Sequence, residues 1–259
     1  MINNFNFKYF IYKTISEFNF NFARDVNGLR ILMYHSIGNK VDDDAYDIYN
    51  ISQKLFLEHV EIFKKYDLIS LDPNIINHMP SGIAITFDDG FSNNLHVANK
   101  ILAPLEIPFT VFVTANNVKE DKHGFLSQKE LLELSRNKNV VIGSHSMNHI
   151  HLAKYDKSRI MSELYESKVY LEDIIGQEVY SLSYPNGSVN KLVRDCAENV
   201  GYKLGLTSRS YINNPTRDKL LLQRTPIWSK DHHSTLKDKI HGKWDWLRYR
   251  HRDPTNDLL

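Results

Sequence analysis

The stretch Ile-Ala-Ile-Thr-Phe-Asp-Asp-Gly at residues 83–90 decides how the rest of the chain is interpreted. Its first five residues are apolar or β-branched, which is typical of a buried strand in a parallel sheet. The stretch ends in two adjacent acids, Asp88 and Asp89, and then Gly90. Adjacent carboxylates repel each other, so they are favoured where they share a cation or divide metal binding and proton transfer between them. Taken alone, the same Asp-Asp-Gly is also an ordinary turn sequence.

A second group of polar residues follows another apolar run. Residues 144–149, Ser-His-Ser-Met-Asn-His, come directly after the strand-like residues 140–143. With one carboxylate from the first stretch, His145 and His149 make a set of two imidazoles and one acid, which suits a catalytic zinc or similar ion with an open position. Either histidine alone is better explained as a buried, hydrogen-bonded side chain. We interpret the neighbouring His151 in that way.

The two motifs together resemble those of the polysaccharide deacetylases, the NodB-homology domain of carbohydrate esterase family 4. Thr-Phe-Asp-Asp-Gly at residues 86–90 matches five contiguous family residues, and the two histidines have the family spacing. The resemblance runs from about residue 30 to about residue 228. It implies a distorted (β/α)₇ barrel formed by a single domain, in which the active site lies at the C-terminal ends of the strands.

Strand-like and helix-like runs alternate along the chain, which favours one α/β domain with parallel strands. Periodicity alone does not distinguish an open sheet from a barrel. Strands are expected at residues 30–34, 68–71, 82–87, 109–114, 140–143, 179–184, 204–207 and 220–223. Helices are expected after Ser52, at 93–103, after Ser127, at 158–175 and at 189–200. We expect residues 1–27 to be an aromatic-rich extension and residues 28–259 to be the deacetylase domain.

The resemblance also implies a role for each acid and histidine of the first two motifs. Asp89, His145 and His149 would hold one divalent metal ion, and zinc is the preferred candidate. Asp88 would be the general base that takes a proton from the metal-bound water. Its alternative role is that of a turn acid.

Residues 182–187, Leu-Ser-Tyr-Pro-Asn-Gly, resemble the third motif of the family. In many members an arginine stands where this chain has Ser183, and an aromatic residue where it has Asn186. The backbone N–H at Asn186 would donate to the oxyanion, and a backbone donor survives a change of side chain. The guanidinium that normally orients the base would have to come from elsewhere. Arg224 is our candidate, and a structural salt bridge is the alternative for this residue.

The acid that protonates the leaving amine is assigned to His35. Residues 31–34, Ile-Leu-Met-Tyr, are an apolar strand that ends at this histidine. The arrangement resembles the circularly permuted branch that includes the poly-N-acetylglucosamine deacetylases, in which this motif lies at the front of the chain. The late histidines His232, His233 and His241 follow no apolar strand, so we do not expect them to fill this role.

These features favour a metal-dependent N-deacetylase that acts on N-acetylated sugars of a bacterial surface glycan or its lipid-linked precursor. One alternative is a catalytically inert glycan-binding domain with the same fold. Such a domain has no physical reason to keep buried charges that face one point. The other alternative is a metal-dependent amidohydrolase for a different amide. Those enzymes usually carry His-x-His after the first strand, whereas here the pattern occurs only mid-chain, at residues 149–151.

The composition limits the classes of partner that this protein is expected to bind. Of the 259 residues, 42% are hydrophobic and 24% charged, and the formal net charge of +1 provides no electrostatic footprint for nucleic acid. With no apolar run long enough to span a membrane and no convincing signal peptide, we expect a cytoplasmic protein. The aromatic residues of 1–22 and the basic and aromatic residues of 237–252 suit peripheral contact with the inner membrane. Packing on the domain surface is the favoured interpretation of both segments, and membrane contact is the alternative. The oligomeric state has no signature in the sequence.

Overall fold

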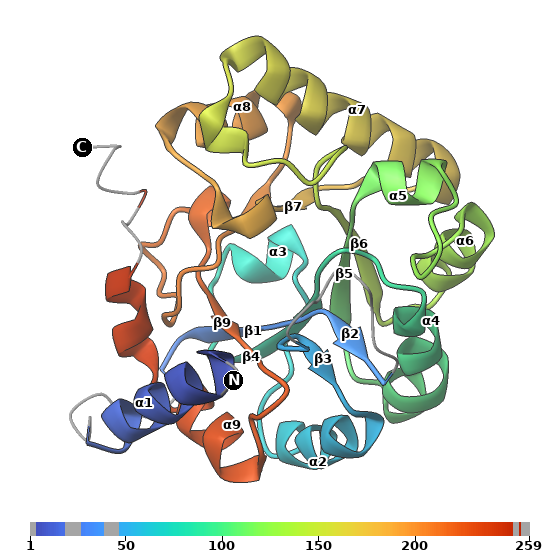
Figure 1. The fold of residues 1–259 in the computed structure, drawn as a ribbon. Coiled ribbons are helices and arrows are strands. Elements are labelled where there is room, and N and C mark those ends of the chain that lie inside the picture. The colour runs from blue at the N-terminus through green and yellow to red at the C-terminus, as the bar shows by residue number, and fades with distance from the viewer. Residues whose placement is uncertain (1–3, 19–26, 39–46, 251–253, 255–259) are drawn as a thin grey trace.

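Seven parallel strands form a nearly closed barrel in the computed structural model, which describes residues 4–18, 27–38, 47–250 and 254. The strand order is β8-β7-β6-β5-β4-β1-β9, with helices around the outside (Figure 1). The strands are β1 (Leu29–Tyr34), β4 (Gly82–Phe87), β5 (Phe109–Val113), β6 (Val140–Ser144), β7 (Ser181–Ser183), β8 (Leu204–Leu206) and β9 (Arg224–Pro226). A separate pair consists of β2 (Ser36–Ile37) and β3 (Asn50–Ile51). The architecture confirms the distorted (β/α)₇ barrel and the single domain.

The barrel closes through backbone hydrogen bonds between β8 and the segment that leads into β9. The Thr207 N–H donates to the Leu222 carbonyl at 2.7 Å, and the Leu222 N–H donates to the Gly205 carbonyl at 2.8 Å. One step further, the Arg224 N–H donates to the Arg209 carbonyl at 3.1 Å. Since β9 also pairs with β1, these hydrogen bonds connect the two ends of the sheet. They hold Arg224, the first residue of β9, between β8 and β1.

Nine α-helices and several shorter helical turns occur in the described residues. The α-helices are α1 (Asn4–Phe18), α2 (Gln53–Phe63), α3 (Pro73–Ile76), α4 (Asn93–Val97), α5 (Ala115–Lys119), α6 (Gln128–Ser135), α7 (Lys157–Ile175), α8 (Lys191–Val200) and α9 (His233–Ile240). The turns are η2 (Ala98–Leu102), η3 (Ala103–Leu105), η4 (Leu152–Lys154), η5 (Pro185–Gly187), η6 (Lys219–Leu221) and η7 (Asp245–Arg250). None of the helices within these residues is long and apolar enough to cross a membrane.

Local sequence explains where several helices begin and end. The Ser52 hydroxyl accepts the Leu55 N–H at 3.2 Å and caps α2. Ser127 and Glu130 form a reciprocal capping box at the start of α6. The α7 helix ends at Gly176, whose φ of 67° is left-handed, a conformation that glycine adopts without steric cost. These three predicted boundaries are confirmed.

Two predicted strands are wrong. Residues 68–71 contribute only an isolated bridge between Leu68 and Ile83, and the last strand is β9 rather than residues 220–223. A short apolar run is buried equally well in a strand or in a turn, so its composition does not distinguish them. The helix expected at residues 93–103 is divided among α4, η2 and η3. The α1 helix lies in the range predicted only as an aromatic-rich extension.

Apolar side chains from the strands pack together in the barrel interior. Ile31, Ala84, Phe112 and Leu206 from four strands pack there with Ile76 of α3, and Figure 1 shows α3 behind the barrel. A separate cluster lies between the strands and the outer helices. In parallel barrels of this kind the pocket forms at the end where the strands terminate.

Candidate active site

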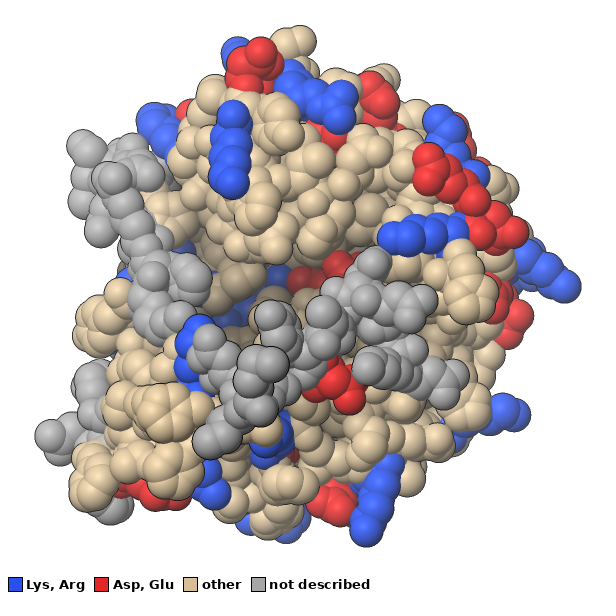
Figure 2. All heavy atoms as spheres, in the orientation of Figure 1, with Lys and Arg blue, Asp and Glu red and all other residues tan. Residues whose placement is uncertain are grey.

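A pocket of about 900 Å³ opens at the C-terminal ends of the strands. His35 follows β1, Asp88 and Asp89 follow β4, His145 follows β6 and Asn186 follows β7, and all five line this pocket. Figure 2 views the molecule from this end, with acidic and basic side chains visible inside a central hollow. The barrel thus brings together residues from opposite ends of the sequence.

Three side chains offer a compact set of metal ligands. One ligand atom from each of Asp89, His145 and His149 lies within 4.8 Å of the others. Asp89 Oδ1 is 3.5 Å from His145 Nε2 and 3.4 Å from His149 Nε2. Exposure rises from 3% for the His145 side chain to 38% for that of His149, so the set is open toward the pocket. One carboxylate and two imidazoles with an open side fit a catalytic zinc or a similar divalent ion.

Hydrogen bonding and burial prepare His145 to bind a cation. Its Nδ1 lies 2.7 Å from the Ser183 carbonyl, which can only accept, so Nδ1 carries the proton and Nε2 presents a lone pair to Asp89. Burial is the largest effect and lowers the pKa of His145 to about 3, although the charge of Asp88 opposes it. The imidazole is therefore neutral near pH 7. A lone pair and a carboxylate oxygen that face each other at 3.5 Å repel unless a cation lies between them.

The backbone of the ligand loops adopts conformations that non-glycine residues rarely take. Asp89, Ser146 and His149 have φ values of 72°, 61° and 54°. The loop after β6 is held by α7, where the buried Glu163 accepts hydrogen bonds from the Asn148 backbone N–H at 2.9 Å and from the Asn148 side-chain amide at 2.8 Å. Such strain persists only where the surroundings enforce it, and it is concentrated at functional sites.

Asp88 is buried and held by a guanidinium. Arg224 Nη1 donates to Asp88 Oδ1 and Nη2 donates to Oδ2, each at 2.7 Å. The Ser183 hydroxyl accepts from Arg224 Nη2 at 2.8 Å and donates to Asp88 Oδ2 at 3.1 Å. Burial acts to raise the pKa of Asp88, but Arg224 and the nearby His145 outweigh it and hold that pKa well below its usual range. Asp88 is therefore an ionised acceptor in a fixed orientation.

Arg224 is locked by the strands around it. Its Nε donates to the Thr207 carbonyl at 3.0 Å, Nη1 lies 3.4 Å from the Thr86 hydroxyl, and its side chain is fully buried. This buried geometry fits both the base-orienting group and the structural salt bridge expected as its alternative. The contribution of the Ser183 hydroxyl was missed from the sequence. The sequence did indicate it in one way, since a small Ser183 stands at a motif position where arginine is usual.

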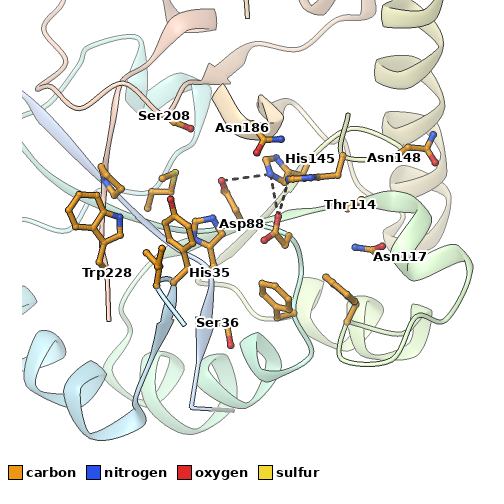
Figure 3. Close-up of a pocket in the computed structure, with 18 of the residues that line it drawn as sticks. His35, Ser36, Asp88, Thr114, Asn117, His145, Asn148, Asn186, Ser208 and Trp228 are labelled. Carbon is orange, nitrogen blue, oxygen red and sulfur yellow. Dashed lines mark ion pairs between the residues drawn. The ribbon is translucent and has the colours of Figure 1, made fainter. Parts of the chain in front are cut away.

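His35 lies beside the two acids and stacks on an aromatic ring. Its ring centroid is 4.4 Å from that of Tyr49, with the planes inclined at 37°. The His35 Nδ1 is buried and has no hydrogen-bond partner within the described part of the chain, so Nε2 is the ring nitrogen available to the pocket. Figure 3 shows His35 between Asp88 and Trp228.

The late histidines lie elsewhere. His232, His233 and His241 are not among the described residues that line the pocket. The His241 Nε2 is 3.0 Å from the Tyr66 hydroxyl. Asn186, in contrast, is exposed on η5 with a φ of 55° and lines the pocket. Figure 3 shows it close to His145.

Sequence reasoning also missed the aromatic wall of the pocket. Phe91 and Phe125 stack with ring centroids 4.9 Å apart, and Tyr49 and Trp228 lie along the same cavity. Apolar and aromatic walls with a few convergent polar groups are typical of small-molecule sites. These four residues come from separate segments, and no local pattern in the sequence links them.

Comparisons with known proteins agree with the fold and the motifs. Residues 77–205 match the family model for polysaccharide deacetylase. YxkH of Bacillus subtilis (strain 168), named as a polysaccharide deacetylase, is 28% identical over 190 residues, which are 70% of this chain and 64% of YxkH. Among solved structures, BC0361, a polysaccharide deacetylase from Bacillus cereus, is 25% identical with a TM-score of 0.72, over 83% of this chain and 69% of that one. The Streptococcus pyogenes deacetylase PplD shares the fold, with a TM-score of 0.74 at 23% identity, over 83% of this chain and 99% of that one.

Proposed function

The chain belongs to the polysaccharide deacetylase family, and from this premise we propose that it is a metal-dependent N-deacetylase of N-acetylated sugars in a bacterial surface glycan or its lipid-linked precursor. The observation that carries the proposal is the arrangement of two groups beside one pocket. The ligand set of Asp89, His145 and His149 lies next to Asp88, a buried carboxylate that Arg224 holds in place. An inert glycan-binding domain would need neither group.

The proposed reaction hydrolyses an acetamide to a free amine and acetate. A divalent ion held by Asp89, His145 and His149 would supply a water of lowered pKa and would polarise the substrate carbonyl. Asp88 takes a proton from the attacking water, and its two bonds to Arg224 keep its orientation constant while it does so. The backbone N–H of Asn186 donates to the carbonyl oxygen as negative charge develops on it.

The carbon–nitrogen bond breaks only if the nitrogen gains a proton, because an amide anion is too basic to leave. We assign the donor to His35, whose unperturbed pKa of about 6.5 suits this transfer near neutrality. Its position at the end of the first strand supports the front-shifted arrangement of the acid motif. Tyr49 keeps the ring oriented by stacking on it.

The direct test combines product analysis with metal analysis. Purified protein loaded with zinc should release acetate from N-acetylated oligosaccharides, and mass spectrometry should show the matching loss of acetyl groups. His145→Ala and His149→Ala should each lose retained metal, whereas His151→Ala, an exposed neighbour outside the ligand set, should keep it. Asp88→Asn should keep the metal and lose activity.

Two results would overturn the proposal. Equal metal retention by wild type and both ligand variants would remove the assigned site. Metal bound normally, with no acetate released from any N-acetylated sugar, would favour the glycan-binding alternative. Comparison of surface glycans from cells with and without the gene would then identify the sugar by its acetyl difference.

A further inference from the structure

One face of α1, its inner face, packs against the rest of the protein. Phe5, Tyr9 and Tyr12 pack against a cluster that includes Trp228 and Trp244. The Tyr9 hydroxyl donates to the Lys230 carbonyl at 2.6 Å, and the Trp246 indole donates to the Ser16 hydroxyl at 2.9 Å. The helix is therefore anchored by aromatic packing and by specific hydrogen bonds.

The opposite face of α1 exposes a group of large apolar side chains. The exposed fractions are 59% for Phe7, 67% for Phe10 and 79% for Phe18, with 38% each for Ile11 and Ile15. At about 100° of rotation per residue, these five positions fall within an arc of roughly 140°. Single exposed apolar residues are ordinary, but five of them on one side of a helix, with Thr14 as the polar residue among them, mark an interaction surface. We call these five residues the outer face of α1.

Charged residues border the outer face. Lys8 and Lys13 are exposed, and on the helical wheel they lie on opposite sides of the apolar arc, between it and the inner face. Glu17, the one acid of the described helix, lies between Lys13 and the apolar arc, so the flanks carry a net positive charge. A helix with an apolar stripe and lysines along its edges suits the boundary of an anionic membrane, where the apolar groups enter the acyl region and the ammonium groups reach the headgroups.

We propose that the outer face of α1 docks on an anionic lipid surface. The two lysines favour this occupant, because their ammonium groups can reach anionic headgroups when the apolar face enters the acyl region. Figure 2 shows a largely uncharged surface over α1, which Figure 1 places at the lower left of the barrel.

Docking would place the candidate active site beside the membrane. The rings of Phe5 and Tyr12 lie 6.1 Å and 6.2 Å from that of Trp228, which lines the pocket. Leu247 belongs both to the cluster under α1 and to the pocket wall. A substrate anchored in the same membrane would reach the pocket without leaving it. This consequence rests on the proposed deacetylase function, whereas the docking does not.

The test is flotation of the full-length protein with vesicles of phosphatidylglycerol and phosphatidylcholine at low salt. Phe7, Phe10 and Phe18 are exposed, so their combined replacement by serine should leave the fold intact and weaken vesicle binding by roughly tenfold or more. Lys8→Glu with Lys13→Glu should weaken binding to the anionic vesicles and have little effect on pure phosphatidylcholine.

A matched control replaces exposed apolar residues on the far side of the barrel. Tyr155, Tyr165 and Leu192 are 46%, 59% and 38% exposed, and Figure 1 places α7 and α8 away from α1. Their triple serine variant should bind vesicles like the wild type. Thermal unfolding and acetate release from a soluble substrate should be unchanged in every variant, which separates failure of docking from failure of catalysis.

Three outcomes would overturn the proposal. One is no flotation of the wild type on anionic vesicles, and another is an equal loss of binding in the control triple. The third is a dimer in light scattering that the Phe7, Phe10 and Phe18 triple dissociates, which would assign the outer face to a second copy of the chain.

Discussion

Replacing Arg224 with serine would leave the carboxylate of Asp88 buried without its cation. Both hydrogen bonds between the two side chains are 2.7 Å long, and the side chains are 0% and 3% exposed. Removing one partner of a buried ion pair typically costs about 3–5 kcal/mol, because the remaining charge stays in a region of low polarity. We expect Arg224→Ser to lower the free energy of unfolding by about this amount.

The same replacement should impair catalysis while metal binding survives. Asp88 would lose both of its bonds to Arg224 and keep the weaker one from the Ser183 hydroxyl, so kcat should fall by roughly 10²–10⁴, the usual scale for one acid–base group. Arg224 supplies none of the three proposed metal ligands. Metal content should therefore stay at the wild-type level, which distinguishes a misoriented base from a collapsed site.

An arginine at residue 183, the third-motif position where many family members carry one, should restore activity to the Arg224→Ser variant. The Ser183 hydroxyl lies 3.1 Å from Asp88 Oδ2 and 2.8 Å from Arg224 Nη2, so an arginine at residue 183 would grow into the volume that Arg224→Ser vacates. The double variant Ser183→Arg with Arg224→Ser should recover at least about tenfold in kcat over Arg224→Ser. Ser183→Arg alone is the matched control and should destabilise the protein, because two guanidiniums would crowd one carboxylate.

Urea unfolding and steady-state kinetics on all four proteins complete the double-mutant cycle. A folded Arg224→Ser variant with kcat within about threefold of wild type would refute the orienting role. A double variant that is folded and holds metal but has no more activity than Arg224→Ser would refute the idea that the two positions serve one carboxylate.

The remaining predictions concern the acid, a buried ion pair and a buried histidine. His35→Ala should keep the metal and the fold but lose roughly 10²–10⁴ in kcat, whereas His241→Ala should change kcat little in steady-state assays. Lys239 Nζ lies 2.5 Å from Asp231 Oδ2 with both side chains 0% exposed, so Lys239→Met should cost about 3–5 kcal/mol in urea unfolding, and adding Asp231→Asn should recover part of it. Burial lowers the pKa of His59, so below about pH 6.5 the unfolded state takes up the proton first and the free energy of unfolding should decrease as the pH is lowered, a slope that His59→Gln should reduce.

Each of these predictions has a result that contradicts it. A silent His35→Ala beside a crippled His241→Ala would mean that the acid motif is not at the front of the chain. Lys239→Met within about 1 kcal/mol of wild type would show that the buried pair is replaceable. Stability that does not change between about pH 7 and pH 5, or that changes equally in His59→Gln, would remove the histidine from the pH dependence.

The sequence by itself determined the fold class and the residues that line the bottom of the pocket. The acids at residues 88 and 89 and the histidines at 145 and 149 follow apolar strands, and the carboxyl ends of parallel strands meet at one rim. Local order is enough for such an inference, because strand direction alone carries these side chains to the same end of the barrel. His35 was placed there by the same reasoning, and the structure brings all five together.

Only the tertiary structure decided which groups face each other across the barrel. Arg224 reaches Asp88 because the short ladder between β8 and β9 closes the circle, and no periodicity near either residue encodes that closure. The aromatic wall depends in the same way on loops that meet only in space. The α1 helix has apolar residues on two opposite sides, so its sequence shows no single apolar stripe. Only the structure shows that one side packs against Trp228 and that the other is exposed.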